Sequence, residues 1–231
     1  MTKILIFFLL SNCLYAAQNN NNEIKALSKD ISKYDKLSEL YLQRGKLYKE
    51  EKKFQKASQD INRAICINPE FLEAKLLLAE VYIKQKKNLK AKVLLDEFLK
   101  DSKNKDARIK VYTFLGDLLM LEEEYEDAVE EYQKIFTNSS VHTQEQFIKM
   151  AEALYESGEY AKSISFLKEG LTTIIEKDTL KLKMIELSSR EGNYSLALAM
   201  LDQMLIEDKD NKKLKKLKIK VLKMKEKGDS F

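Results

Sequence analysis

The sequence predicts an all-α protein built from repeated helix pairs, and three observations support this fold class. The chain of 231 residues contains only six glycines and one proline, the residues that most often interrupt helices. Its apolar residues recur at spacings of three and four, the period of an amphipathic helix. One arrangement of small and aromatic residues also recurs along most of the chain, which indicates that a single helical unit is repeated.

The arrangement is clearest in the first unit, and Gly45 serves as its reference position. The other marker residues lie 3, 9, 12, 19 and 24 positions further on: Tyr48, Phe54, Ala57, Ala64 and Pro69. Two helices cross closely only where the facing residues are small, so Gly45 and Ala57 are predicted to form the contact between two antiparallel helices. Proline cannot continue a helix, and we therefore expect the second helix to end before this residue.

Four further units keep these offsets along the chain. Their reference positions are Ala79, Gly116, Ala151 and Ile185. The fifth unit is the weakest, because isoleucine replaces the small residue there. The five units together cover residues 38–210.

This pattern resembles the tetratricopeptide repeat, a helix-turn-helix unit of about 34 residues. The resemblance implies a right-handed α-solenoid of about five repeats. It also implies a concave surface, lined by the first helix of each repeat, to which a protein or peptide binds.

Each repeat leaves an apolar face that a neighbour must cover, so both ends of the solenoid need a cap. At the N-terminal end, a short amphipathic helix is predicted over residues 24–37 from the spacing of Ile24, Leu27, Ile31 and Tyr34. At the other end, residues 211–231 are predicted to form a basic capping helix and tail. Its apolar stripe consists of Leu214, Leu217, Val221 and Met224. A second interpretation, compatible with capping, is that the lysines of this helix are attracted to anionic lipid.

The start of the chain has the pattern of a secretory signal. Residues 1–12 combine Lys3 with an apolar run that is far shorter than the roughly 20 residues of a membrane-spanning helix. The sequence Leu-Ser-Asn-Cys that ends at Cys13 resembles a bacterial lipobox, which implies acylation of this cysteine. The alternative is conventional cleavage after Ala16 or Ala17. Residues 13–23, which contain the polar run from Gln18 to Asn22, are predicted to be a flexible tether.

The sequence contains no constellation that predicts catalysis, a cofactor or a metal site. The single histidine, His142, lies in a polar stretch and is expected to be solvated. The acidic run from Leu121 to Tyr132 is interpreted as the solvated face of a repeat helix, and Cys66 as a buried apolar residue. The net charge is only +4, and the excess of lysine is confined to the C-terminal end, so nucleic-acid binding is not predicted.

Candidate partner-binding residues follow from the helical period on the first helix of each repeat. Positions three before, one after and four after the small reference residue share one face. Applied to the first four repeats, this rule selects Leu42, Lys46, Lys49, Leu76, Glu80, Ile83, Thr113, Asp117, Met120, Ile148, Glu152 and Tyr155. After the first repeat the stripe is apolar and flanked by acids, which favours a bound segment with apolar anchors and some basic residues. The alternative is that several of the apolar members only pack between helices.

Together these observations favour a membrane-tethered lipoprotein that acts as a protein-interaction scaffold in the bacterial cell envelope, on the periplasmic side, rather than an enzyme. In architecture and length the chain resembles the lipoprotein subunit of the outer-membrane β-barrel assembly machinery. Two other functions fit the same architecture. One is an adaptor for envelope proteases or peptidoglycan enzymes, and the other is a ligand-binding lipoprotein that serves a transporter.

Overall fold

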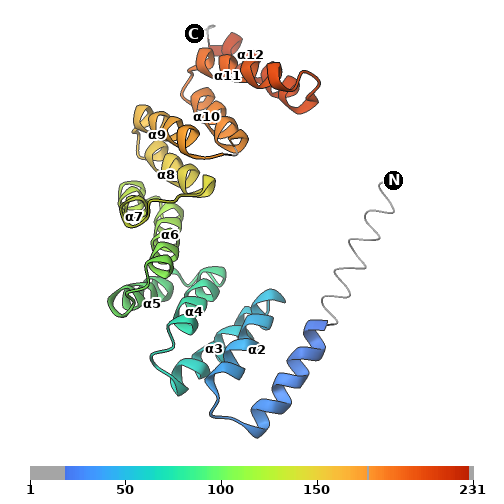
Figure 1. Ribbon diagram of the computed structural model, residues 1–231, viewed down its shortest axis with the longest axis vertical. Helices are drawn as coiled ribbons and strands as arrows, with labels where there is room; N and C mark the ends of the chain where they lie inside the picture. Colours follow the sequence, from blue (N-terminus) through green and yellow to red (C-terminus); the bar gives the residue numbers. More distant parts are fainter. Residues whose placement is uncertain (1–18, 176, 229–231) are drawn as a thin grey trace. The chain divides into compact units, whose positions relative to one another are not determined.

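The computed structural model describes residues 19–175 and 177–228. These residues form helices and connecting turns only, as predicted for an all-α fold (Figure 1). The chain divides into two compact units, one ending at Val111 and the other beginning at Tyr112. We describe each unit by itself.

The first unit contains an N-terminal helix at residues 19–33 and two helix pairs. Its first pair is α2 (Ser38–Glu50) with α3 (Phe54–Ile67), and its second is α4 (Leu72–Lys84) with α5 (Asn88–Asp101). Consecutive helices pack in antiparallel order, and their apolar side chains form one core that includes Tyr41, Ile61 and Leu78. Helix α6 (Lys105–Leu121) begins in this unit and ends in the second.

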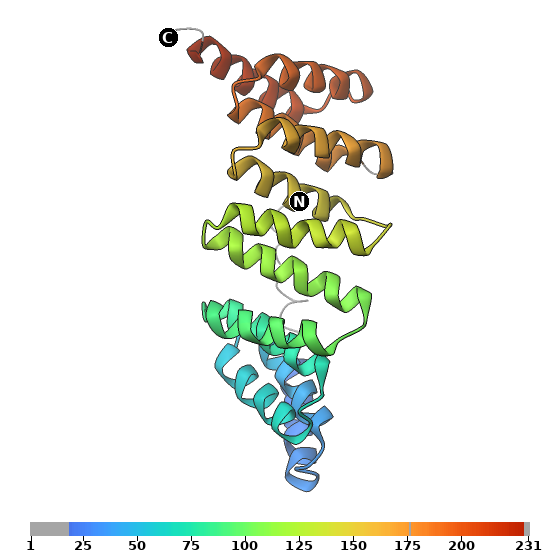
Figure 2. The same ribbon diagram turned by 90° about the vertical axis from the view of Figure 1, so that its left-hand side faces the viewer.

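The second unit contains the end of α6, five complete helices and the C-terminal helix. Their bounds are α7 (Tyr125–Asn138), α8 (Gln144–Glu156), α9 (Tyr160–Thr173), α10 (Asp178–Arg190), α11 (Tyr194–Glu207) and α12 (Lys212–Gly228). Figure 2 shows these helices lying one after another within the unit. The ten helices α2 to α11 therefore form the five predicted pairs within the described residues.

Close packing at the small reference residues explains why the helices pair in this register. A Cβ atom placed on Gly45 would lie 2.7 Å from Cγ1 of Ile61 and 3.5 Å from the carbonyl oxygen of Ala57. In the fourth pair, the buried Ser163 of α9 donates a hydrogen bond of 2.6 Å to the carbonyl oxygen of Ala151 in α8. The crossing predicted for Gly45 and Ala57 is thus present, because only a residue without a side chain lets α3 approach this closely.

The turn inside each pair is the same in all five pairs. Its residue seven positions after the reference has a left-handed backbone, at Lys52 (φ 58°), Lys86 (φ 58°), Glu123 (φ 62°), Gly158 (φ 86°) and Gly192 (φ 85°). In the first pair, the amide of Lys52 donates to the carbonyl of Lys49 at 2.9 Å, and the amide of Lys53 donates to that of Tyr48 at 2.8 Å. These two bonds define a Schellman motif, which satisfies carbonyls at the end of the first helix.

The N-terminal helix differs from the prediction at both of its ends. We predicted it over residues 24–37, but its described part occupies residues 19–33, so the last five residues of the predicted tether are helical. Tyr34 follows the helix in a turn and is 51% exposed, whereas Ile24, Leu27 and Ile31 of the same predicted stripe are buried. The predicted signal, Cys13 and the first part of the tether lie outside the described residues.

A charged contact fixes this helix on the first repeat. Arg44 of α2 donates two hydrogen bonds of 2.7 Å to the carboxylate of Asp60 in α3, and a third of 3.0 Å to Ser28 Oγ. The guanidinium also lies 5.9 Å from the ring centroids of both Tyr41 and Tyr48. One side chain therefore joins the N-terminal helix to both helices of the first pair.

Helix α12 packs against the last pair along its apolar stripe. Leu214 and Val221 are buried with Ile185 of α10 and Leu201 of α11, and Leu217 packs partly against them. The charged side of α12 remains exposed. Within residues 19–175 and 177–228, none of the helices has the length and apolar character that crossing a membrane requires.

Candidate partner-binding surface

In each unit, the candidate surface consists of the first helices of the pairs, and we call the side that these helices share within that unit its inner face. It comprises α2 and α4 in the first unit, and the end of α6, α8, α10 and α12 in the second. Helix α12 belongs to it because it follows α11 in the position of a sixth first helix.

In the first unit, the selected lysines are bound by acids of the neighbouring repeat. Lys46 Nζ lies 2.5 Å from Glu73 Oε1, and Lys49 Nζ lies 2.6 Å from Glu80 Oε2. Glu80 was itself selected as a partner-binding acid, so two members of the selected set bind each other.

The apolar members of the set in this unit differ in exposure. Leu42 is 3% exposed and belongs to the core, where it packs with residues of both pairs. It is therefore not on the inner face. Leu76 and Ile83 of α4 are half-buried and keep part of their surface accessible.

In the second unit, Asp117 lies at the centre of a partly buried polar contact. Lys149 Nζ of α8 lies 2.5 Å and 2.7 Å from its two carboxylate oxygens, and the Tyr132 hydroxyl donates to it at 2.6 Å. The pKa of the Tyr132 phenol is raised far above its usual value, mainly by burial and secondly by its hydrogen bond to Asp117. The carboxylate of Asp117 is thus occupied by two donors from its own unit.

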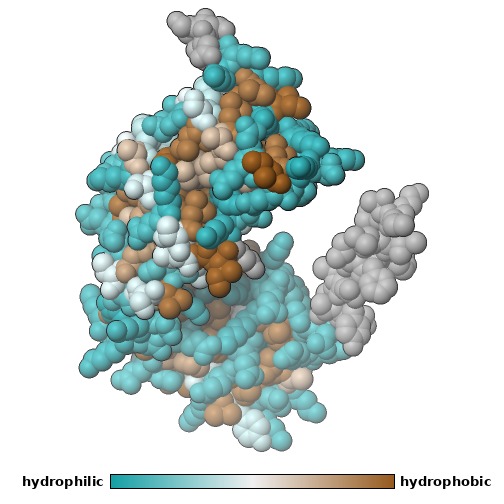
Figure 3. Space-filling view, turned by 45° about the horizontal axis from the view of Figure 1, so that its top comes forward, coloured by the Kyte–Doolittle hydropathy of each residue, from teal (hydrophilic) through white to brown (hydrophobic). Residues whose placement is uncertain are grey.

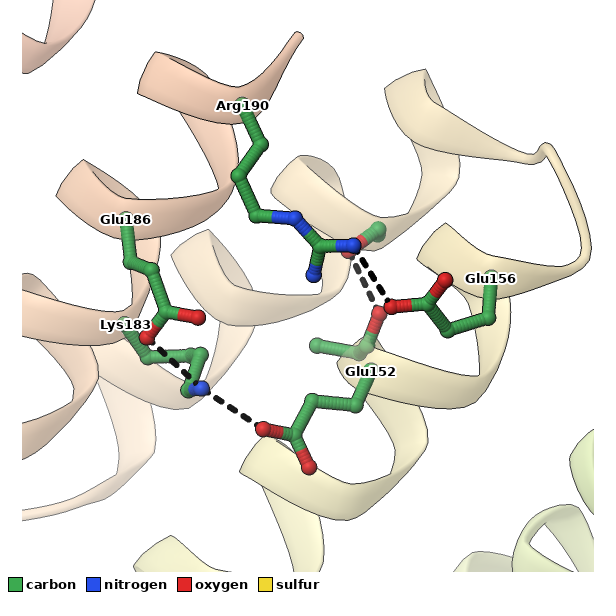
Figure 4. Close-up of polar contacts among 7 residues, drawn as sticks. Glu152, Glu156, Lys183, Glu186 and Arg190 are labelled. Carbon is green, nitrogen blue, oxygen red and sulfur yellow. Dashed lines mark hydrogen bonds and ion pairs between the residues drawn. The ribbon is translucent and has the colours of Figure 1, made fainter. Parts of the chain in front are cut away.

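The acids of α8 are bound by bases of α10, as Figure 4 shows. Lys183 Nζ lies 2.6 Å from Glu152 Oε1 and 2.8 Å from Glu186 Oε2. Burial lowers the pKa of Lys183, but the hydrogen bonds to these two carboxylates outweigh it, and the pKa is raised. Lys183 therefore stays protonated and offsets one of the two negative charges beside it.

A second contact between the same helices uses the arginine of α10. Arg190 Nη2 lies 2.8 Å from Glu156 Oε1, and the guanidinium lies 4.4 Å from the ring centroid of Tyr155. The hydrogen bond to Glu156 is the main cause that raises the pKa of Arg190. Tyr155 is 8% exposed, so it supports the arginine and offers little surface to a partner.

The remaining selected residues lie at the margin of the core. Thr113 and Met120 of α6 are half-buried. Ile148 of α8 is also half-buried and packs against the core of the fourth pair. Leu42 and Tyr155 therefore pack between helices, as the alternative interpretation predicted. Ile148 does so with the buried part of its side chain.

The acids and bases on the inner face of the second unit follow one rule. An acid directly after the reference residue binds a lysine that lies two residues before the reference of the next repeat. This describes Asp117 with Lys149 and Glu152 with Lys183, pairs separated by 32 and 31 residues. The sequence contained this signal, but the selection considered each helix alone.

The structure also shows a groove between α10 and α12 that the selection missed. One cavity of about 320 Å³ is lined by apolar and by polar side chains. The apolar ones are Leu182, Ile185, Leu217, Val221 and Met224, and the polar ones are Glu186, Ser189, Arg190 and Lys220. A neighbouring cavity of about 300 Å³ shares Leu182 and Leu217. Figure 3 looks toward this end of the chain, where brown apolar patches lie among teal polar side chains.

The sequence could have identified this groove. The rule that selected three positions in each of the first four repeats gives Leu182, Glu186 and Ser189 in the fifth, and all three line the first cavity. The selected set covers only the first four repeats, and in the fifth Ile185 replaces the small reference residue.

Two residues outside the selected set lie in surroundings that the sequence did not predict. The ring of His142 lies 4.4 Å from that of Phe136 and 6.0 Å from that of Phe147, so the residue is not a freely solvated loop histidine. Burial lowers its pKa below the ordinary value of 6.5, and its Nδ1 atom is buried without a partner in the described part of the chain. Cys66, predicted to be buried, is exposed.

The acidic run of α6 and α7 has the character of a repeat helix. Ala128 and Tyr132 are buried, and most of the acids between Leu121 and Tyr132 are exposed. Across the residues that the structure describes, no three or more potential metal ligands of the His, Cys, Asp and Glu types gather in one place.

Comparison with known proteins agrees with this architecture. The tetratricopeptide repeat family matches residues 48–110, which lie in the first unit. The whole fold is similar to that of solved tetratricopeptide proteins. The protein has the tetratricopeptide repeat fold. No curated protein sequence is significantly similar to the chain.

Three solved structures illustrate the similarity in fold. The first is YrrB, described as a tetratricopeptide protein with an unusual peptide-binding site; it is 18% identical, with a TM-score of 0.60 over 84% of this chain and 98% of that one. PilF of Pseudomonas aeruginosa is 14% identical, with a TM-score of 0.67 over 93% and 96% of the two chains. MamA is 16% identical, with a TM-score of 0.58 over 82% and 94%. At these identities the similarity establishes the fold.

Proposed function

We propose that the protein is a tetratricopeptide scaffold of the bacterial cell envelope that is tethered to a membrane through an acylated Cys13 and binds segments of partner proteins on its inner face. Repeat proteins of this kind are protein-interaction scaffolds, because stacked helix pairs present an extended surface rather than an enclosed site. The peptide-binding site named for YrrB is consistent with this use of the fold.

The observation that carries the proposal is the exposed apolar groove between α10 and α12. Elsewhere on the inner face of the second unit, Asp117, Glu152 and Glu156 are occupied by bases of the same unit. In the groove, by contrast, Leu182 is 39% exposed although it lies between two helices. Exposed apolar surface bordered by charged groups is typical of a protein-binding site.

The finer part of the proposal places the scaffold at the periplasmic face of a membrane, in the assembly of outer-membrane β-barrel proteins. It is supported by the order of a short apolar signal, the lipobox-like cysteine, polar residues and about five repeats. An adaptor for envelope proteases or peptidoglycan enzymes has the same architecture and differs only in the partner. The solute-binding alternative is less well supported, because cavities of about 320 and 300 Å³ are at the lower end of the range for small-molecule sites.

The anchor is tested by metabolic labelling with a fatty acid and by membrane fractionation. We expect label and membrane association to be lost in Cys13→Ala. Cys66→Ala is the matched control, since it removes the other cysteine, which is exposed in the first unit. Equal labelling of all three proteins would contradict the lipidation.

The partner is tested by crosslinking in native membranes, followed by purification of the wild type and the two cysteine variants. The proposal predicts that β-barrel assembly components are recovered with the wild type and Cys66→Ala and are lost with Cys13→Ala. Recovery of proteases or peptidoglycan enzymes would favour the adaptor. Recovery of transporter subunits alone, or of no protein, would contradict the scaffold.

A further inference from the structure

We propose that the groove between α10 and α12 binds an acidic, amphipathic helical segment of a partner protein, with an apolar side chain seated between Leu182 and Leu217 and carboxylates on the lysines of α12. The inference rests on the proposed scaffold function and specifies the chemistry of its partner. It also reverses the expectation from sequence, which favoured a partner with basic residues.

The apolar floor gives the groove its shape and length. Its two cavities meet at Leu182 and Leu217, and together they extend from Asn211, directly before α12, to Met224 within it. At a rise of 1.5 Å per residue this distance is about 20 Å, the length of a helical segment of three to four turns. A helix that lays its apolar face into such a groove is one of the recurring modes of peptide recognition.

The charge beside the groove is positive and unbalanced. Lys213, Lys216, Lys220 and Lys223 follow one another at spacings of three and four, so they share one side of α12. With Leu217 and Ile219 they surround a shallow hollow of about 540 Å³. None of these four lysines forms an ion pair with a residue that the structure describes.

Other charges of the groove oppose these lysines only near the start of α12, where Asp178, Glu207 and Asp208 line the same cavity as Lys213. Glu186 is bound to Lys183 within α10, and Arg190 of α10 is bound to Glu156 of α8. The remaining lysines of α12 with an acidic partner, Lys215 and Lys218, bind Asp210 and Asp202. Like charges at these helical spacings repel each other, so a bound row of carboxylates would relieve that repulsion.

The acids at the other end of the groove fix the orientation of the segment. Asp178 and Asp208 line the cavity that lies nearer the start of α12. We therefore expect the carboxylates of the partner to lie over Lys216, Lys220 and Lys223, and its apolar residues to lie deeper, toward Leu182.

The arrangement favours a protein segment over a lipid surface. Three apolar residues of α12, Leu217, Val221 and Met224, line the groove between the two helices, whereas Leu222 is 39% exposed. On the outward side of α12, Ile219, which is 55% exposed, is flanked by Lys216 and Lys223. A flat bilayer would contact the lysines and leave the groove unfilled, whereas a helix fills it.

The test selects a displayed library of random 14-residue peptides on the purified full chain. The enriched peptides are then measured with four proteins: the wild type, Leu182→Gln, the double variant Lys216→Glu/Lys220→Glu and the control Lys103→Glu/Lys168→Glu. The control has the same change in net charge at exposed lysines outside the groove. Leu182 is partly exposed, so its replacement is expected to leave thermal unfolding nearly unchanged.

We expect the enriched peptides to be acidic, with apolar residues three or four positions apart. Their affinity should fall roughly tenfold or more in Lys216→Glu/Lys220→Glu and in Leu182→Gln, and stay within about twofold in the control. Enrichment of neutral or basic peptides, equal loss in the control, or no enrichment would overturn the inference. Binding to vesicles of anionic phospholipid that depends on Lys216 and Lys220, without peptide binding, would overturn it in favour of a membrane contact.

The membrane crosslinking experiment separates this inference from the scaffold function. Partners that are recovered equally with the wild type and with Lys216→Glu/Lys220→Glu would leave the scaffold intact and exclude this groove as the binding site. Absence of any recovered partner would contradict both.

Discussion

The contact between Gly116 and Tyr132 allows a test of the packing. Replacing Gly116 with alanine should raise stability through helix propensity and lower it through overpacking against the ring. Gly116 lies within α6, and a Cβ atom there would lie 2.7 Å from both Cδ1 and Cζ of the Tyr132 ring in α7. The ring is 2% exposed, and its hydroxyl is held by Asp117 at 2.6 Å. The ring therefore has little room to move away from an added methyl group.

The magnitudes predict that Gly116→Ala destabilises the protein. Replacing glycine with alanine inside a helix contributes about 0.5–1 kcal/mol of stability. Overpacking a filled core costs about 1–3 kcal/mol, and displacing the ring also weakens a hydrogen bond to a charged acceptor, worth about 1.5–3 kcal/mol when fully lost. Because Asp117 is partly exposed, water replaces part of that bond, and the net loss is about 1–3 kcal/mol.

Urea unfolding followed by far-UV circular dichroism measures this difference through the transition midpoint. The matched control makes the same change in a Tyr132→Leu background, where the ring no longer opposes the methyl group. In that background, Gly116→Ala should destabilise the protein less or even stabilise it. A double-mutant cycle reports this difference as a coupling free energy between positions 116 and 132. An unchanged or higher midpoint for Gly116→Ala in the wild-type background would refute the packing argument.

Three further predictions address the turns, the register and the histidine. Lys86→Gly should stabilise the protein by up to about 1 kcal/mol, because a left-handed backbone strains lysine. Gly158→Ala should destabilise the protein by about 1–2 kcal/mol for the same reason. A urea midpoint that moves in the opposite direction for either variant would exclude this backbone strain. Ala128→Leu should overpack the third pair and cost about 1–3 kcal/mol, so unchanged thermal unfolding would contradict the register. Burial lowers the folded-state pKa of His142 below 6.5, so its contribution to stability is present above that pH and is lost as the pH falls through the folded-state value. His142 is the only histidine, and His142→Phe should therefore reduce the loss of stability between about pH 7 and 5; identical pH profiles for the two proteins would show that its protonation is not linked to folding.

The architecture was predictable because its determinants are local. The small residues at Gly45, Gly116 and Ala151, each with an aromatic or small residue at a fixed distance, specify where two helices cross. Together with Ala79 and Ile185 in the second and fifth pairs, these markers placed all five helix pairs. The N-terminal helix was less predictable, because its boundaries depend on polar residues that have no strong helical preference and on contacts such as the one from Arg44.

The binding surface was only partly predictable because charge pairing is not local. Helical periodicity identified the side on which Glu80, Asp117 and Glu152 lie. It did not show that bases of the adjacent helices occupy them, although the rule that describes two of these pairs is visible once the repeats are aligned. His142 was misjudged for the same reason, since Phe136 and Phe147 reach it from two different helices.

The most direct test of the scaffold function is site-specific photo-crosslinking in native membranes. A photo-reactive residue at position 182 lies in the groove between α10 and α12, and one at position 89 lies on α5, where the side chain is 77% exposed. The account predicts a discrete crosslinked protein from position 182 that is absent at position 89 and in Lys216→Glu/Lys220→Glu. The same products from both positions, or none from position 182, would contradict partner binding at this groove.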